Sequence, residues 1–406
     1  MAVSGICFLP RPSFFKNKRV IIRVDANVGA AGNRIINDFR LRRVLPTILK
    51  VAPLARLTLL VSHRGSFEKV NDYSETLSPV AKHLAKLLKR KVYFCAEPLQ
   101  GVSQVLAALP NHAVVLLENI RWQKGERENS RVLAKQLAGL ADVYINDAFG
   151  ESNRQEASIV GITKFLPSFA GLLLQDEIRH LDDLRLNPLK PFVVVLGGAK
   201  LKTKLPLIKR FLKIADKVLL GTALANTFIA AQGRSIGASL YEPKFINSAR
   251  SLLKNKKLVL PQDYLVAKRI YKGKGRVISG DVGKNELIVD IGPKTIKEFV
   301  NIIKGTRTVF WNGQMGCFEY QPFSKGSRAV AKAILNNKKA KKIIGGGETI
   351  ALLQRTKSKV KSQSPQRGTP LAGKSKLFIS TGGGAMLAYL AGKKLVGIEA
   401  LKRINE

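Results

Sequence analysis

Apolar residues along this chain gather in short continuous runs and do not alternate with polar residues. The runs have the length of strands, and helix-like stretches separate them: RVIIRVD, LTLLVSH, AVVLLEN, VYINDAF, FVVVLGG, KVLLGTA, LIVDIG, TVFWNG, KIIGGGE and LFISTGGG. Strands without alternation are typical of parallel sheets that helices cover on both faces. The pattern therefore predicts an α/β fold built from doubly wound parallel sheets.

Each run ends in polar residues or glycines. These are Asp25, His63, Glu118, Asn119, Asn146, Asp147, Gly197, Gly198, Asn312, Glu348 and Thr381. In open parallel sheets, ligands bind beyond the carboxyl ends of the strands. The positions predict two functional edges, one before and one after about residue 180.

A chain of 406 residues exceeds what one hydrophobic core usually fills, so we expect two domains. The stretch FLPSFAGLLLQDEIRHLDDLRLNPLKP predicts a connecting helix from near Phe169 to about Leu186. We therefore expect an N-terminal domain over 1–168, a helix and linker over 169–190 and a C-terminal domain over 191–392. Residues 355–376 are rich in Lys, Ser, Gln and Gly, which predicts a mobile loop.

The formal net charge of +41 predicts attraction of polyanions at low salt. Lysines are spread along the whole chain, and no helix-turn-helix, zinc-finger or RNP-type pattern accompanies them. A generally basic, solvated surface is the simpler interpretation, and binding of RNA or DNA stays open as the alternative.

Membrane insertion and disulfide scaffolds are not expected. The sequence has no apolar stretch of spanning length, and its first residues lack the pattern of a signal peptide. Cys7, Cys95 and Cys317 are too widely spaced for a disulfide framework or a zinc site, which fits a reducing compartment. We therefore expect a cytoplasmic protein.

Two glycine triplets in the second half follow apolar runs and precede helix-like stretches. They are Gly345, Gly346 and Gly347, and Gly382, Gly383 and Gly384. Such turns let backbone N–H groups approach phosphate oxygens at a helix N-terminus, although tight strand-to-helix packing also favours small residues. Neither the P-loop pattern nor the dinucleotide-binding pattern is present, so a dehydrogenase-like enzyme is not favoured.

Charged residues strengthen the phosphate interpretation. Lys200 and Lys204 lie four residues apart after a predicted strand, where two ammonium groups can neutralise phosphates. Glu348 follows the first triplet and is placed to hold Mg²⁺, or alternatively to act as a favourable acid at a helix N-terminus. Glu319 is either an acceptor for ribose hydroxyls or a surface carboxylate.

Arginines at predicted strand ends mark the first half. Arg40, Arg121 and Arg154 lie at or soon after such ends, and His63 closes another. Arginine binds carboxylate and phosphate through two parallel hydrogen bonds, which suits a small, multiply anionic metabolite. Each arginine taken alone also fits a structural ion pair, so the prediction rests on the set.

Ordered motifs along the chain resemble those of the phosphoglycerate kinase family. They are RVDANV, DFRLRRVLPTI, LLENIRW, NDAFGE, LGGAKLKTKL, LANTFIAAQG, DIGPKT, WNGQMGCFE, IIGGGET and STGGGAML, and the resemblance extends from about Lys18 to Leu401. It implies two doubly wound, Rossmann-like domains joined by a helix with a cleft between them, and residues 393–406 packing back on the first domain. It also implies a monomeric glycolytic enzyme that closes by a hinge and transfers phosphate between 1,3-bisphosphoglycerate and Mg-ADP, giving 3-phosphoglycerate and ATP.

The resemblance assigns roles position by position. Binding of the glycerate is implied for Asp25, Asn27, Arg40, His63, Arg121 and Arg154. Binding of the nucleotide is implied for Gly198, Ala199, Lys200, Lys204, Asn312, Glu319, Gly345, Gly346, Gly347, Glu348 and Thr349, with Glu348 also on the metal. A catalytic role is implied for Arg40, Lys200, Gly382, Gly383 and Gly384, because donors there stabilise the charge of the phosphoryl group in transfer.

The chain departs from the family pattern at several of these motifs. Ser66 replaces an arginine, Asn153 and Glu156 replace histidines, and Glu348 replaces an aspartate. Further departures are Thr203, Thr222, Ala223 and Gln314. Since these changes touch the anion sites, a weakly active or inactive relative with a basic nucleic-acid-binding surface is the alternative function.

Overall fold

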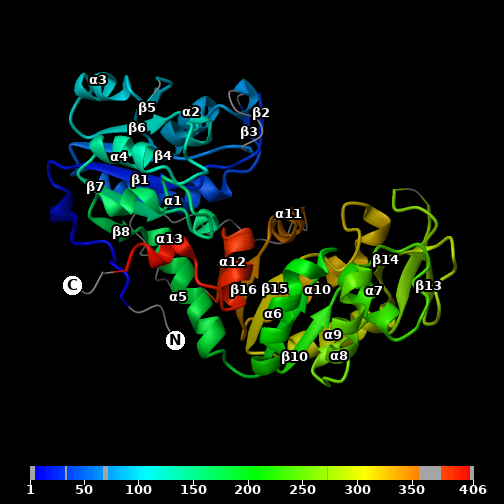
Figure 1. Ribbon diagram of the computed structural model, residues 1–406. Helices are drawn as coiled ribbons and strands as arrows, with labels where there is room; N and C mark the ends of the chain where they lie inside the picture. The colour runs from blue at the N-terminus through cyan, green and yellow to red at the C-terminus, as the bar shows by residue number, and fades with distance from the viewer. Residues whose placement is uncertain are drawn as a thin grey trace. The chain divides into compact units, whose positions relative to one another are not determined.

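The computed structural model describes residues 5–32, 34–66, 72–97, 99–271, 273–355 and 376–402. They form two compact units (Figure 1). The first contains the described residues up to Arg179 and those from Lys394 onward, and the second contains those from His180 to Lys393. Helix α5 (Leu172–Leu186) carries the chain from the first unit into the second.

The first unit is built on a six-stranded sheet in the order β5–β6–β4–β1–β7–β8. The strands are β1 (Arg19–Val24), β4 (Leu57–Val61), β5 (Val92–Cys95), β6 (Ala113–Leu117), β7 (Val143–Asp147) and β8 (Ser168–Ala170). Every neighbouring pair is parallel, and Ile21 of β1 lies beside Leu59 of β4 and Tyr144 of β7. The carboxyl ends of all six strands therefore share one edge.

Helices and a small hairpin complete the first unit. They are α1 (Phe39–Val51), α2 (Ser78–Leu88), α3 (Val102–Ala107), α4 (Arg131–Gly139), α13 (Val396–Glu399), and the pair β2 (Ala30–Ala31) and β3 (Arg34–Ile35). The buried residues of α1, such as Leu41, Val44 and Ile48, recur at helical spacing and join the core formed by the sheet. Near α13, the Gly397 N–H donates to the Ser152 carbonyl at 2.8 Å.

The second unit repeats the design with a six-stranded parallel sheet in the order β11–β10–β9–β15–β16–β17. The strands are β9 (Phe192–Leu196), β10 (Lys217–Leu220), β11 (Leu258–Val259), β15 (Thr308–Asn312), β16 (Lys341–Gly345) and β17 (Leu377–Ile379). The helices are α6 (Leu201–Ile214), α7 (Thr222–Ala231), α8 (Ile246–Leu252), α9 (Pro293–Lys304), α10 (Lys325–Asn336), α11 (Gly347–Arg355) and α12 (Gly383–Leu390). Trp311 and Phe299 anchor a core between the sheet and these helices.

The prediction of two doubly wound parallel-sheet domains is confirmed, but one predicted strand was wrongly placed. The run LIVDIG gives β14 (Leu287–Ile291), which lies outside the parallel sheet and pairs antiparallel with β12 (Tyr264–Ala267). β12 also pairs antiparallel with β13 (Arg276–Ile278), completing a three-stranded sheet. A five-residue buried run looks the same in either kind of sheet, because pairing direction is set by tertiary contacts.

The connecting helix also begins later than expected, at Leu172, because the preceding residues pair as β8 with β7. Of the predicted mobile loop, residues 356–375 lie outside the described part of the chain. None of the helices described is both long and apolar enough to cross a membrane.

Candidate active site

Residues that follow β1 meet the start of α1 at the edge of the first sheet. Arg40 Nη1 lies 3.0 Å from Asp25 Oδ2 and donates to the Asn27 carbonyl at 3.2 Å. The Asn27 N–H donates to Asp25 Oδ1 at 3.1 Å, which closes a tight turn. The turn holds a guanidinium group from the second residue of α1 over the end of β1.

The loop after β4 is fixed from two sides. The Gly65 N–H donates to Asn27 Oδ1 at 3.2 Å, and Arg121 Nη1 donates to the Gly65 carbonyl at 2.6 Å. Gly65 has a φ of +75°, which favours glycine, and a Cβ there would require the Glu75 carboxylate to move. This arrangement links Arg121, which follows β6, to the turn after β1.

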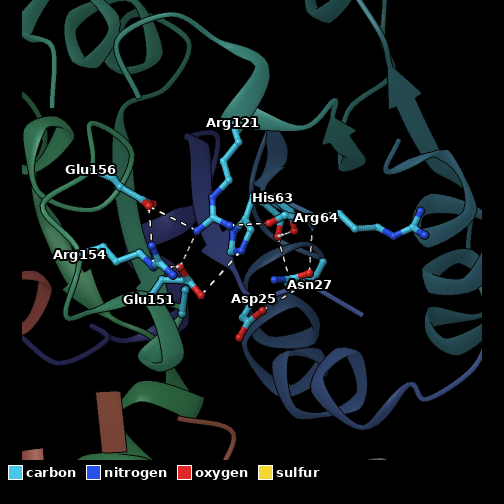
Figure 2. A network of polar contacts seen from close by, with 12 residues as sticks. Asp25, Asn27, His63, Arg64, Arg121, Glu151, Arg154 and Glu156 are labelled. Carbon is cyan, nitrogen blue, oxygen red and sulfur yellow. Dashed lines mark hydrogen bonds and ion pairs between the residues drawn. The ribbon is translucent and has the colours of Figure 1, made fainter. Parts of the chain in front are cut away.

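Two buried carboxylates face the arginines of this edge (Figure 2). Glu151 Oε2 accepts from Arg121 Nη2 at 3.0 Å and lies 2.7 Å from Arg154 Nε. Glu156 Oε1 lies 3.4 Å from the same Arg121 Nη2 and 3.9 Å from Arg154 Nε. Burial raises the pKa of Glu151, and the Asp25 carboxylate adds to this rise while Arg23, Arg154 and Arg121 oppose it.

His63 is a neutral member of the cluster that Arg121, Arg154, Glu151 and Glu156 form. Arg23 Nη2 lies 3.1 Å from His63 Nδ1, and since arginine only donates, we assign Nδ1 as the acceptor and Nε2 as the protonated nitrogen. Nε2 lies 3.7 Å from Glu151 Oε1. Burial, reinforced by Arg23 and Arg121, lowers the pKa of His63 well below 6.5, so the ring stays uncharged.

A buried network lies beneath the cluster and connects to it through Arg23. Arg23 Nε donates to Ser158 Oγ at 2.9 Å, and Ser158 Oγ donates to Glu126 Oε1 at 2.5 Å. Burial raises the pKa of Glu126 to about 7, with Arg23 opposing the rise. The first unit therefore contains a carboxyl group that titrates near neutrality close to the site.

Arg64 does not take the place of the arginine that the family has where this chain has Ser66. Its Nε donates to the Val28 carbonyl at 3.2 Å and its Nη1 to the Thr76 carbonyl at 3.0 Å, and Figure 2 shows the guanidinium group directed away from the cluster. Ser66 and Asn153 are exposed, whereas Glu156 is buried. Of the departures in this unit, Glu156 therefore changes the interior of the cluster.

In the second unit, the turn between β9 and α6 brings glycines and lysines together. Gly198 has a φ of +83°, and a Cβ there would lie 2.9 Å from Lys204 Nζ, so glycine leaves room for the ammonium group. Lys204 is buried, and among the residues that the structure describes no carboxylate lies within ion-pair distance of it. Burial lowers the pKa of Lys204, and Glu348 opposes this shift. Ala199 and Lys200 are exposed beside this turn.

The ends of β15 and β16 are tied together by Asn312 and Thr349. Asn312 Nδ2 donates to the Gly345 carbonyl at 2.8 Å, and the Gly313 N–H donates to Thr349 Oγ1 at 2.7 Å. Gly346 has a φ of +99°, and a Cβ there would lie 2.7 Å from Asn312 Nδ2. These contacts leave Gly347 and Glu348 exposed in the first turn of α11.

The second glycine triplet opens α12. Gly382 precedes the helix and its N–H donates to Ser380 Oγ at 3.1 Å, while Gly383 has a φ of +48°. Gly384 is exposed, and a Cβ added there would enter open space. Gly383 and Gly384 thus form the N-terminus of α12, with Gly384 exposed and Gly382 buried.

The remaining positions in this unit have ordinary contacts. Glu319 is exposed in the segment between β15 and α10. Thr222 Oγ1 donates to the Met315 carbonyl at 2.8 Å, and Thr203 Oγ1 donates to the Lys200 carbonyl at 3.0 Å. The Gln314 carbonyl accepts from the Gly198 N–H at 3.1 Å, so Gln314 forms part of the wall of the glycine turn.

A divalent ion fits the donor set of this unit only together with a nucleotide. The described residues contain no group of three or more His, Cys, Asp or Glu side chains arranged to hold a metal. Glu348 offers one exposed carboxylate, and Mg²⁺ usually binds through one or two carboxylates and the phosphates of a substrate. The residues present therefore fit a magnesium–nucleotide complex.

Sequence reasoning selected Arg40, Arg121 and Arg154 but missed a fourth arginine and several of the groups that these arginines contact. Arg23, Glu126, Glu151 and Ser158 were not among the expected site residues. Arg23 carried a signal, because a charge inside the apolar run RVIIRV requires a buried partner. The identity of that partner is not readable from the sequence, since Ser158 lies far along the chain.

Comparisons with known proteins point to one protein family. The sequence matches a family model described as phosphoglycerate kinase over residues 13–393. It is 40% identical over 398 residues to a phosphoglycerate kinase of Thermosipho africanus, covering 95% of each chain. It is 37% identical to one of Rubrobacter xylanophilus, covering 96% of this chain and 97% of that one. The fold matches the phosphoglycerate kinase structure from Coxiella burnetii with a TM-score of 0.80 at 38% identity, covering 95% of this chain and 96% of that chain.

Proposed function

The chain belongs to the phosphoglycerate kinase family, and from this premise we propose how its own residues carry out phosphoryl transfer. It is a phosphotransferase with a carboxyl group as acceptor. In the proposed reaction, an oxygen of the ADP β-phosphate attacks the phosphorus of the acyl phosphate of 1,3-bisphosphoglycerate. The bond between that phosphorus and the carboxyl oxygen breaks, which yields ATP and 3-phosphoglycerate, and the reaction is reversible.

The first unit binds the glycerate in this proposal. Arg121 and Arg154 bind its anionic groups, and Asp25 and Asn27 hold its hydroxyl. The observation that carries the assignment is the convergence of three guanidinium groups, from Arg40, Arg121 and Arg154, on one edge of the sheet, with buried Arg23 beneath them. Such a cluster suits a small metabolite with several negative charges.

The second unit binds the nucleotide. Lys204 and Lys200 neutralise its phosphates, while Gly198, Ala199, Asn312, Thr349 and the first glycine triplet line the pocket and Glu319 accepts from the ribose. Glu348 would hold Mg²⁺, which when bound supplies charge neutralisation at the phosphate oxygens. The buried ammonium of Lys204 supports this role, because an unpaired buried charge is costly unless a ligand pairs with it.

Transfer itself requires donors around the moving phosphoryl group and no covalent enzyme intermediate. Arg40, Lys200 and the backbone N–H groups of Gly382, Gly383 and Gly384 take this role by stabilising the charge on its three equatorial oxygens. The proposal includes hinge closure that brings the two ligands together and excludes water. It also places the enzyme in the cytoplasm as a monomer.

A weakly active nucleic-acid-binding relative is not favoured, because the family match extends over residues 13–393.

A coupled assay tests the activity, and calorimetry tests the two binding sites. We expect magnesium-dependent formation of ATP from 1,3-bisphosphoglycerate and ADP. Lys204→Ala should weaken binding of Mg-ADP by roughly tenfold or more and leave 3-phosphoglycerate binding unchanged, because a charge-assisted contact is lost in one unit only. Lys202→Ala removes an exposed lysine from the same helix and serves as the control. Folded protein without ATP formation would refute the proposed function.

A further inference from the structure

The arginine cluster of the first unit is largely neutralised by the protein itself. Four guanidinium groups, from Arg23, Arg40, Arg121 and Arg154, face three carboxylates, from Asp25, Glu151 and Glu156, each within 4.0 Å of at least one of them. In a chain of net charge +41, the site for an anionic metabolite is therefore close to charge balance.

Glu151 and Glu156 contact the arginines in different ways. Glu151 makes close contacts, at 2.7 Å to Arg154 and 3.0 Å to Arg121. Glu156 reaches three arginines at longer range, 3.4 Å to Arg121, 3.9 Å to Arg154 and 3.7 Å to Arg23. Its side chain is only 3% exposed, and among the described residues its Oε2 accepts no hydrogen bond.

We propose that Glu156 is a positioning residue that acts as an internal counter-ion for Arg121 and Arg154 and thereby lowers the affinity of the first unit for its anionic metabolite. The inference rests on the proposed function for the identity of that metabolite. The lowered affinity for an anion is inferred from the contacts and burial of Glu156 alone.

Competition for Arg121 gives the physical reason. Arg121 Nη1 donates to the Gly65 carbonyl, and Nη2 is shared by Glu151 and Glu156. A phosphate or carboxylate that binds Nη2 of Arg121 must displace at least one of these carboxylates or share its donor. The added negative charge also lies close to Glu156 in a buried setting, where repulsion is weakly screened. Removing the charge of Glu156 weakens both obstacles, although Glu151 keeps its contact with Arg121.

Glu156 also contributes to stability, and the two effects have opposite signs. The contacts of buried Arg23 at hydrogen-bond distance are to neutral groups, the Val24 carbonyl, Ser158 Oγ and His63 Nδ1. Within the described residues, Glu156 is the carboxylate at ion-pair distance from Arg23. Neutralising Glu156 should therefore destabilise the fold while tightening anion binding. If Glu156 had only a structural role, its neutralisation would lower both the stability of the fold and the affinity for the anion.

The test compares Glu156→Gln with Glu128→Gln, which removes one negative charge from an exposed position of the same unit. Titration of 3-phosphoglycerate without nucleotide, at fixed ionic strength, should show binding to Glu156→Gln roughly tenfold tighter than to wild type. The KM for 3-phosphoglycerate should fall by a larger factor than any change in kcat. Glu128→Gln should bind like wild type. Equal or weaker binding by folded Glu156→Gln would overturn the inference.

A second variant guards against failure of the first to fold. Glu156→His, measured at pH 8 where the imidazole is largely neutral, should also bind 3-phosphoglycerate more tightly than wild type. Equal or weaker binding by this variant would count against the inference in the same way.

Inorganic sulfate separates this inference from the proposed function. If wild type neither binds 3-phosphoglycerate nor forms ATP, the proposed function fails. Tighter sulfate binding by Glu156→Gln than by Glu128→Gln would still support the counter-ion role. If wild type is active and neither Glu156 variant binds 3-phosphoglycerate or sulfate more tightly, only the inference fails.

Discussion

Arg40 Nη1 lies 3.0 Å from Asp25 Oδ2, which joins the second residue of α1 to the residue that follows β1. The Arg40 side chain is 34% exposed, while that of Asp25 is buried. The carboxylate therefore anchors the guanidinium group from below and leaves part of it open to a ligand.

Arg40→Ala should lower kcat by roughly 10²- to 10³-fold, because it removes a donor positioned for the transferring phosphoryl group. Arg40→Lys should recover only part of this loss, since an ammonium group cannot reproduce the planar fork of arginine. Steady-state kinetics with both substrates saturating measures the effect.

Arg42→Ala is the matched control, because Arg42 lies on the same helix and pairs with Asp38 at 2.8 Å. Its kcat should stay close to that of wild type. Equal losses in the Arg40 and Arg42 variants would mean that general helix damage, and not a lost donor, explains the effect.

Gly346→Ala should destabilise the protein by about 1–3 kcal/mol, because the position has a φ of +99° and its Cβ would press on the Asn312 amide. Gly347→Ala is the natural comparison, since that Cβ would enter open space. Urea unfolding of both variants measures the difference. Similar stabilities would show that the strain at Gly346 is absorbed by local movement.

Glu348→Gln should raise the magnesium concentration needed for half-maximal rate by roughly tenfold or more, because the carboxylate charge that would hold the ion is gone. Rates at saturating nucleotide over a series of magnesium concentrations, after removal of metal with EDTA, provide the measurement. An unchanged magnesium requirement would exclude Glu348 as a ligand.

Glu126→Gln should change how stability depends on pH. The pKa of Glu126 is raised from 4.5 to about 7 by burial, so between these values the folded protein keeps a proton that the unfolded chain has released. Raising the pH through this window therefore destabilises wild type, by on the order of 3 kcal/mol in total. Glutamine has no proton to lose, so the variant should lack this decline.

Unfolding free energies at pH 5 and pH 8 test this expectation. Glu126→Gln should be clearly more stable than wild type at pH 8, and the difference should shrink toward pH 5. Asp147 and Asp290, whose pKa values burial also raises to about 7, titrate in both proteins and cancel in the comparison. A difference that does not vary with pH would contradict the assignment.

The sequence by itself determined the class of fold and the sheet edges where the candidate site residues lie. Continuous buried runs such as RVIIRV and FVVVL are typical of parallel sheets covered on both faces, and the residues after them emerge at one edge of such a sheet. That reasoning placed Asp25, His63 and Gly198 correctly at strand ends. These inferences succeed because they depend on local periodicity and chain direction.

Only the tertiary structure decided which charges meet. Arg121 contacts Glu151 and Glu156, and Arg23 donates to Ser158. Arg64 donates to the Val28 carbonyl and points away from the cluster. The run LIVDIG likewise became an antiparallel strand. Pairing between residues distant in sequence is set by packing and burial, which no local pattern encodes, and this is why the balance of charge in the site could not be read from the chain.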